Sequence, residues 1–134
     1  MPVVVDPSAI LGLAMEDEAA DFGASVLTEI ESGGGLAPSI FWYELRNVLV
    51  VNERRGRITP EATTTFLATL EELPIEIEDL PSEAGVLLLA RKHQLSVYDG
   101  AYLELASRSG APLATLDARL RDVAAAVGAR LFGS

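Results

Sequence analysis

Three consecutive β-branched residues, Val3, Val4 and Val5, constrain the fold more than any other stretch of the chain. An apolar run without alternation is typical of a strand covered on both faces, as in a parallel sheet flanked by helices. The run ends at Asp6, and Pro7 suits the first position of a helix. The sequence therefore predicts a buried parallel strand that ends in a strand-to-helix turn, where open α/β sheets place their functional sites.

The rest of the chain alternates between helical and strand patterns. Apolar residues at helical spacing predict helices over residues 16–31, 40–53, 60–73, 82–93, 96–106 and 118–126. Short strands are predicted at residues 36–37, 75–80, 112–115 and 130–132. Charged residues alternate with apolar ones in the strand at 75–80, which places it near a sheet edge. We therefore expect a single α/β domain over residues 1–134.

Composition limits the chemistry that is available. The chain has no cysteine and one histidine, His93, so disulfides and thiolate metal sites are excluded and zinc is disfavoured. His93 follows basic residues at a predicted helix end, which favours a role at the helix terminus over a Ser-His-Asp triad. No basic signal region opens the chain, and the densest apolar run, residues 84–90, is too short to cross a bilayer. We expect a soluble cytoplasmic protein without a membrane partner.

The net charge of −10, from 20 acidic and 10 basic residues, argues against a partner that carries many phosphates. Bound divalent cations would cancel several of these negative charges locally. Nine of the ten basic residues are Arg, whose planar fork suits phosphate. Arginines cluster at residues 54–57 and 119–121, although the favoured explanation of such clusters is a solvated helix end.

Asp99 lies in the first turn of its predicted helix, three positions after Ser96. The two residues form a capping-box pattern, which satisfies N–H groups at the helix start. The inward-facing side chains of Tyr102, Leu103 and Ala106 would draw Asp99 toward the interior, where a carboxylate needs a compensating cation. A capping role and a functional role are both open for Asp99.

Three further acids have two interpretations each. Asp6 and Asp117 both follow a short strand and open a helix, so each is an N-cap or a ligand. Glu44 lies within an apolar stripe, and we expect its helix face to be largely buried without a local basic partner. Its neighbours at helical spacing are Ile40, Phe41, Val48 and Val51. A position at the edge of the stripe, reaching solvent, is the alternative for Glu44.

Taken together, the four acids favour one shared site over four separate explanations. Clustered carboxylates at neutral pH either share protons or bind a cation. A cation held only by oxygen ligands is Mg²⁺ or Mn²⁺. Such a cation polarises a phosphoryl oxygen and activates water, and two cations about 3.5 to 4 Å apart would stabilise the attacking and leaving oxygens together.

The segments around the four acids resemble the PIN-domain ribonucleases, and among them the VapC-type toxins of bacterial toxin-antitoxin pairs. The segments are Val-Val-Asp-Pro-Ser, Trp-Tyr-Glu-Leu-Arg-Asn-Val-Leu, Leu-Ser-Val-Tyr-Asp-Gly-Ala-Tyr-Leu-Glu-Leu-Ala and Ala-Thr-Leu-Asp-Ala-Arg-Leu. They occur in family order, and the resemblance spans essentially the whole chain. It implies a three-layer α/β/α sandwich with a central short-stranded parallel sheet. It also implies an endoribonuclease that depends on Mg²⁺ or Mn²⁺, forms a homodimer and is inhibited by an antitoxin protein.

The resemblance assigns roles residue by residue. The acidic quartet, which holds the metal and carries catalysis in this family, is matched by Asp6, Glu44, Asp99 and Asp117. Thr115 matches a small hydroxyl residue near the fourth acid, and Ser8 and Asn47 are expected to support the site. Arg46 and Arg119 are candidate contacts to RNA. Pro7 departs from the pattern, because the family usually has a small residue there.

Two other functions remain as alternatives. A phosphoryl-transfer domain that forms an aspartyl-phosphate is disfavoured, because Ser8 stands where an Asp-x-Asp motif needs its second acid. A receiver-like site also wants a lysine after a late strand, and Lys92 lies inside a predicted helix. A non-catalytic PIN-like binding module would use the acids only as helix caps and the apolar helices as a partner surface.

Overall fold

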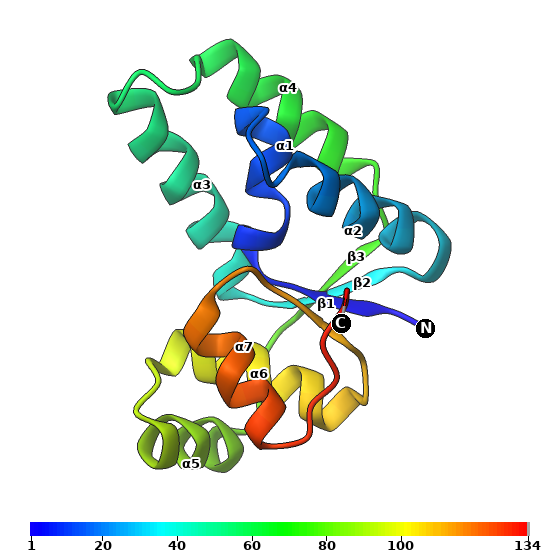
Figure 1. Cartoon of the computed structure of the whole chain (residues 1–134), viewed down its shortest axis with the longest axis vertical. Helices are drawn as coiled ribbons and strands as arrows, with labels where there is room; N and C mark the ends of the chain where they lie inside the picture. Colours follow the sequence, from blue (N-terminus) through cyan, green and yellow to red (C-terminus); the bar gives the residue numbers. More distant parts are fainter. Residues whose placement is uncertain (134) are drawn as a thin grey trace.

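The computed structural model describes residues 1–133 and arranges them around a four-stranded sheet (Figure 1). The strands are β1 (Val3–Val5), β2 (Gly35–Pro38), β3 (Ile75–Glu78) and β4 (Leu113–Ala114). Their order is β3-β2-β1-β4, and all neighbouring strands are parallel. The all-valine strand β1 therefore lies inside the sheet and is fully buried, as its sequence predicts. The strand with alternating charges, β3, lies at an edge, also as predicted.

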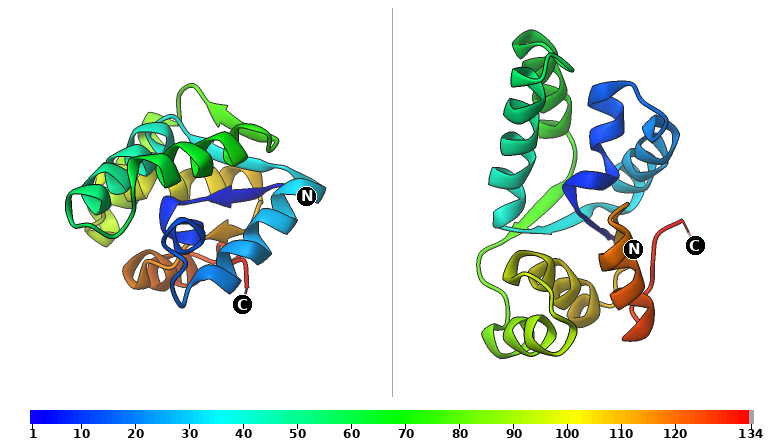
Figure 2. Two further views of the ribbon diagram at one scale, coloured as in Figure 1. Left: turned by 90° about the horizontal axis from the view of Figure 1, so that it is seen from above. Right: turned by 60° about the vertical axis from the view of Figure 1, so that its left-hand side comes forward.

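Helices cover both faces of this sheet. They are η1 (Pro7–Ala9), α1 (Leu11–Met15), α2 (Ala20–Gly33), α3 (Ile40–Arg54), α4 (Pro60–Glu71), α5 (Glu83–His93), α6 (Val97–Ser109) and α7 (Ala118–Ala126). Figures 1 and 2 show α1 to α4 on one side of the sheet and α5 to α7 on the other. The three-layer α/β/α fold is thereby confirmed. No helix within residues 1–133 is long and apolar enough to cross a membrane.

The central helix of the second layer is α6, which packs on β1 and β2. Its residues from Gly100 to Ala106 are all buried, so the middle of the helix is covered on every side. Gly100 permits the close approach of α5, because a Cβ atom there would lie 3.3 Å from the carbonyl oxygen of Val86. This packing fixes the position of the first turn of α6, which carries Asp99.

Two predicted boundaries were wrong. The helix expected from residue 16 begins at Ala20, because Glu16 has a left-handed φ of 53° and ends α1. The carboxylate of Asp17 then accepts a hydrogen bond from the backbone N–H of Ala19 at 2.8 Å, which favours a turn before α2. The strand expected at residues 130–132 is a single bridge between Leu131 and Leu113.

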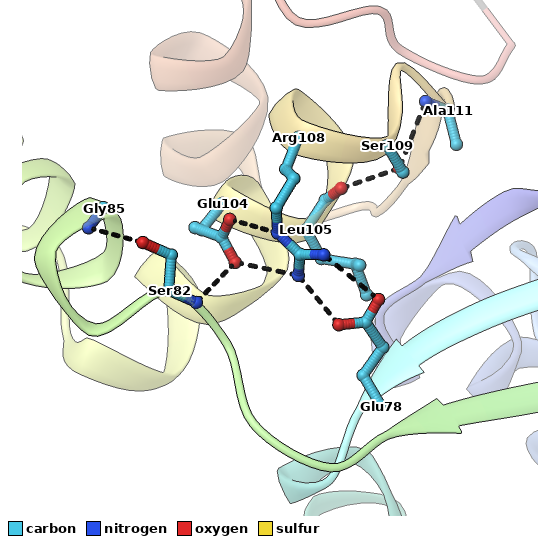
Figure 3. A network of polar contacts seen from close by, with 8 residues as sticks. All are labelled: Glu78, Ser82, Gly85, Glu104, Leu105, Arg108, Ser109 and Ala111. Atoms are coloured by element: carbon cyan, nitrogen blue, oxygen red, sulfur yellow. Dashed lines mark hydrogen bonds and ion pairs between the residues drawn. The ribbon is translucent and has the colours of Figure 1, made fainter.

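A polar network joins the edge strand to α6 (Figure 3). Glu104 on α6 is only 5% exposed, and its carboxylate accepts hydrogen bonds from Ser82 N at 3.3 Å and Arg108 Nε at 2.7 Å. The Arg108 guanidinium also contacts Glu78 at the end of β3, with Nη2 2.8 Å from Oε1. One arginine therefore satisfies a buried carboxylate and holds the β3–α5 connection against α6.

Replacing Arg108 by Met is expected to lower the free energy of unfolding by about 1–3 kcal/mol, because it removes the main partner of a buried acceptor. Urea denaturation followed by circular dichroism measures this change. Arg91→Met, at an exposed position on α5, is the matched control and should change stability by less than about 0.5 kcal/mol. Equal stabilities for the two variants would contradict a stabilising role for the network.

Candidate active site

Two adjacent strand ends place the first carboxylate of the site. Asp6 directly follows β1 and Thr115 directly follows β4, and these strands pair with Val5 opposite Ala114. The next residues along the two strands therefore lie side by side. Thr115 Oγ1 donates a hydrogen bond to Asp6 Oδ2 at 2.9 Å, and Asp6 is only 8% exposed. The parallel register thus holds Asp6 in a largely buried position at the carboxyl edge of the sheet.

A second hydroxyl group reinforces this arrangement. Ser8 Oγ donates to Asp6 Oδ2 and accepts a hydrogen bond from the backbone N–H of Leu116 at 2.9 Å. Ser8 therefore ties η1 to the loop before α7, and Figure 1 shows these two segments meeting at one edge of the sheet. Asp6 occupies the N-cap position of η1, and two hydroxyl groups orient its carboxylate. Ser8 and Thr115 both lie where a supporting role for Asp6 requires them.

Asp117 is an N-cap of α7, as one of its two interpretations predicted. Its Oδ1 accepts a hydrogen bond from the N–H of Leu120 at 2.8 Å. Its own N–H donates to Thr115 Oγ1 at 3.1 Å, so the Thr115 hydroxyl bridges Asp117 and Asp6. Asp117 is exposed, and the cap bond uses only one of its two carboxylate oxygens. Capping and metal binding are therefore compatible at Asp117.

Asp99 lies in the first turn of α6, where the hydroxyl of Ser96 accepts a hydrogen bond from its backbone N–H at 3.0 Å. The predicted cap at Ser96 is therefore confirmed. The side chain of Asp99 is partly buried, and burial raises the pKa of its carboxyl. The negative charges of Asp117 and Asp6 raise that pKa further. Asp99 is thus electrostatically coupled to both strand-end acids.

Glu44 lies at the edge of the buried stripe of α3, so the prediction of a largely buried face centred on it was wrong. The stripe is one position out of phase and consists of Phe41, Leu45, Leu49 and Asn52. Glu44 is partly buried, and burial raises the pKa of its carboxyl, with smaller contributions from the charges of Asp6 and Asp99. This places Glu44 in the same electrostatic cluster as the other acids.

Tyr102 is a residue of the site that the sequence indicated only as an inward-facing core position. Its side chain is 0% exposed, and its hydroxyl donates a hydrogen bond to Glu44 Oε1 at 2.6 Å. Burial raises the pKa of the phenol well above its ordinary value, and the hydrogen bond to Glu44 and the nearby carboxylates add to this. The spacing of three residues from Asp99 is the signal for its place, because such residues share a helix face.

The four acids come from four elements, and their charges affect one another's pKa values. Burial raises the pKa of Asp6, and the charge of Asp117 adds to it, while hydrogen bonds from Ser8 and Thr115 oppose the rise. Within residues 1–133, no three His, Asp or Glu side chains are placed so that together they could hold a metal ion. The donor set nevertheless fits Mg²⁺ or Mn²⁺, because it consists of carboxylate oxygens whose mutual repulsion a dication relieves.

The remaining predicted site residues are Asn47, Arg46 and Arg119, and the contacts of the two arginines are with other groups. Asn47 is exposed on α3, and Arg46 lies 3.8 Å above the ring of Trp42 and donates to its carbonyl oxygen at 3.2 Å. Arg119 donates to the carbonyl oxygen of His93 at the end of α5. In the part of the chain that the structure describes, neither guanidinium contacts the acidic quartet.

In a chelating buffer, the free energy of unfolding is expected to fall as pH rises above about 4. The folded protein retains protons on Asp6, Glu44 and Asp99 at pH values where the unfolded chain has lost them. Stability therefore decreases between the ordinary and the raised pKa values. Urea titrations at several pH values measure how steeply the free energy of unfolding changes with pH. Subtracting the curve of Asp99→Asn isolates the contribution of Asp99 from that of the other acids. A parent slope no steeper than that of Asp99→Asn would contradict the electrostatic cluster.

Comparisons with known proteins agree with this arrangement. A model of the PIN domain matches residues 3–126, a range that includes the whole acidic quartet. Ribonuclease VapC3 from Pyrobaculum aerophilum is 32% identical over 126 residues, which is 91% of this chain and 94% of that protein. The crystal structure of PAE2754, also from Pyrobaculum aerophilum, has a TM-score of 0.72 and 25% sequence identity. That similarity covers 92% of this chain and 86% of the other.

Proposed function

The chain belongs to the PIN domain family, and from this we propose that it is an endoribonuclease that depends on Mg²⁺ or Mn²⁺. The observation that supports the proposal most directly is the electrostatic coupling of four carboxylates from four different elements. The raised pKa values of Asp6, Glu44 and Asp99 reflect burial and repulsion between carboxylates, and a bound dication would relieve that repulsion. The whole chain, residues 1–134, acts as one domain in this proposal.

In this proposal, different contacts orient the individual acids for metal binding. Asp6, oriented by the hydroxyls of Ser8 and Thr115, offers a fixed buried ligand. Asp117 is anchored by its cap bond and offers its second oxygen, while Asp99 and Glu44 complete the ligand set from the opposite layers. When bound, the metal supplies Lewis acidity toward a phosphoryl oxygen and lowers the pKa of water. Arg46 and Arg119 remain candidates for contacts to the RNA.

The direct test is cleavage of a structured RNA by the purified protein in Mg²⁺, in Mn²⁺ and in a chelator. Metal-dependent cleavage by the parent, and none by Asp99→Asn purified in parallel, supports the proposal. The variant controls for contaminating nucleases because it carries the same purification history. Equal cleavage by parent and variant, or cleavage that survives the chelator, would count against it.

We further propose that the protein is a cytoplasmic toxin of a type II toxin-antitoxin pair and forms a homodimer. Its relative carries the name Ribonuclease VapC3. The antitoxin would lay a helix on this protein and bring a basic residue to the acidic quartet, in competition with the metal. A purified complex that cleaves RNA as fast as the free protein would contradict this inhibition. Sedimentation velocity of the free protein measures the proposed dimer.

A non-catalytic PIN-like binding module is the second candidate, and one observation favours it. Asp117 makes the cap bond that this interpretation requires, so part of its role is structural in either case. The two candidates differ in their response to metal. A module without catalysis should show no difference between parent and Asp99→Asn in the cleavage assay, and no saturable binding of Mn²⁺ in calorimetry.

A further inference from the structure

The buried phenol of Tyr102 lies between the two helices that carry Asp99 and Glu44. Tyr102 is on α6, three residues after Asp99, and its hydroxyl reaches across to Glu44 on α3 with an O–O distance of 2.6 Å. We propose that Tyr102 is a positioning residue that holds the Glu44 carboxylate in the orientation needed to bind a divalent cation. This inference rests on the proposed metal-dependent function.

The hydrogen bond from Tyr102 uses only one of the two carboxylate oxygens of Glu44. Tyr102 donates to Oε1, and Oε2 of Glu44 has no hydrogen bond or ion pair within the part of the chain that the structure describes. A carboxylate fixed through one oxygen presents the other in a defined direction. The glutamate side chain has several rotatable bonds, and ordering them in advance reduces the entropy lost when a ligand binds.

Repulsion explains why Glu44 needs a partner. Its charge is opposed by those of Asp6 and Asp99, and it lies at the edge of the buried stripe, where it is only partly covered. Without the bond, the side chain would lower its energy by turning into solvent, away from the other acids. Tyr102 is 0% exposed and held by the core, so it cannot follow such a movement. A rigid donor thus keeps a mobile acid in the cluster.

Tyr102→Phe removes only the hydroxyl and is the first test. Its affinity for Mn²⁺, measured by calorimetry, is expected to fall about tenfold, in the range for residues that orient a metal ligand. In RNA cleavage, kcat should fall by a larger factor than the factor by which KM rises. Tyr98→Phe is the matched control, because Tyr98 is on the same helix and 57% exposed. It should bind Mn²⁺ as the parent does.

A second background tests whether the hydroxyl acts through Glu44. Glu44→Asp keeps the charge but is one methylene shorter, so its carboxylate falls short of the phenol. Adding Tyr102→Phe to Glu44→Asp should change the affinity for Mn²⁺ by less than about twofold, because coupled residues are not additive. The same loss in both backgrounds would overturn the proposal, since the hydroxyl would then act by another route.

Thermal melts of Tyr102→Phe and Mn²⁺ binding by Asp99→Asn distinguish a failure of this inference from a failure of the proposed function. In chelator, Tyr102→Phe should melt cooperatively, and a loss of cooperative melting would show that the hydroxyl holds the fold and overturn the proposal. If Asp99→Asn loses Mn²⁺ binding and Tyr102→Phe does not, only the role of Tyr102 is wrong. If the parent binds no Mn²⁺, or Asp99→Asn binds it as the parent does, the proposed function fails and this inference fails with it.

Discussion

Replacing Asp6 by Asn is expected to reduce metal-dependent RNA cleavage by more than about 100-fold while the protein remains folded. Residues that only orient a metal ligand change affinity or activity by about 10–100-fold, so loss of a ligand charge should exceed that range. The amide oxygen of Asn can still accept the hydrogen bonds from Ser8 and Thr115. Removing a buried charge also removes repulsion, so the variant should be at least as stable as the parent in chelator.

The measurement is kcat/KM for a structured RNA, with thermal melts in chelator on the same samples. Asp122→Asn is the matched control, because Asp122 is an exposed acid on α7 outside the acidic quartet. It changes the net charge by the same amount and should leave cleavage within about twofold, as surface substitutions usually do. If kcat/KM of Asp6→Asn is comparable with that of Asp122→Asn, the role of Asp6 is purely structural.

Asp117 allows the cap and ligand roles to be separated. Asn caps a helix about as well as Asp, whereas Ala costs about 1 kcal/mol of stability because the bond to Leu120 N–H is lost. Asp117→Asn and Asp117→Ala should both impair cleavage, but only the second should lower the melting temperature. If Asp117→Asn is fully active, the cap bond is the whole role of this residue.

The parts of the site that the sequence predicts well are those set by strand ends. A run such as Val3 to Val5 is typical of a strand buried on both faces of a parallel sheet, so a position for Asp6 at a strand end could be predicted. The same argument applies to Asp117, which comes after β4. Parallel strands bring their carboxyl ends to one edge, so two of the four acids could be placed together from local patterns alone.

The parts that the sequence predicts poorly depend on helix rotation and on contacts between layers. Whether Glu44 or Leu45 faces the core is a difference of about 100° around α3, and the apolar pattern there is consistent with either. The bond between Tyr102 and Glu44 joins residues 58 positions apart in the sequence, and an inward-facing tyrosine alone does not identify its partner. The late start of α2 depends on the left-handed backbone of Glu16, for which the side chain gives no signal.

Addition of Mn²⁺ or Mg²⁺ is expected to raise the melting temperature by about 10 °C once the cation is at a hundredfold excess over its Kd. Binding to the native state alone contributes RT ln(1 + [L]/Kd), which is about 2.7 kcal/mol at that excess. For a chain of 134 residues, each kcal/mol corresponds to about 4 °C. Differential scanning fluorimetry across a range of cation concentrations, with chelator as the zero point, measures the effect.

General charge screening is a second explanation for such an increase in melting temperature, and it must be tested. The net charge is −10, and any dication screens repulsion among the 20 acidic residues. Screening should raise the melting temperature of Asp99→Asn nearly as much as that of the parent. Under screening, both melting temperatures should increase gradually with ionic strength. Binding at the acidic quartet should instead give a saturable increase in the parent that Asp99→Asn and Asp6→Asn largely lose, while Asp122→Asn keeps it. An increase shared equally by all four proteins would mean that the cation acts on the general surface charge, and a shared metal site would then be wrong.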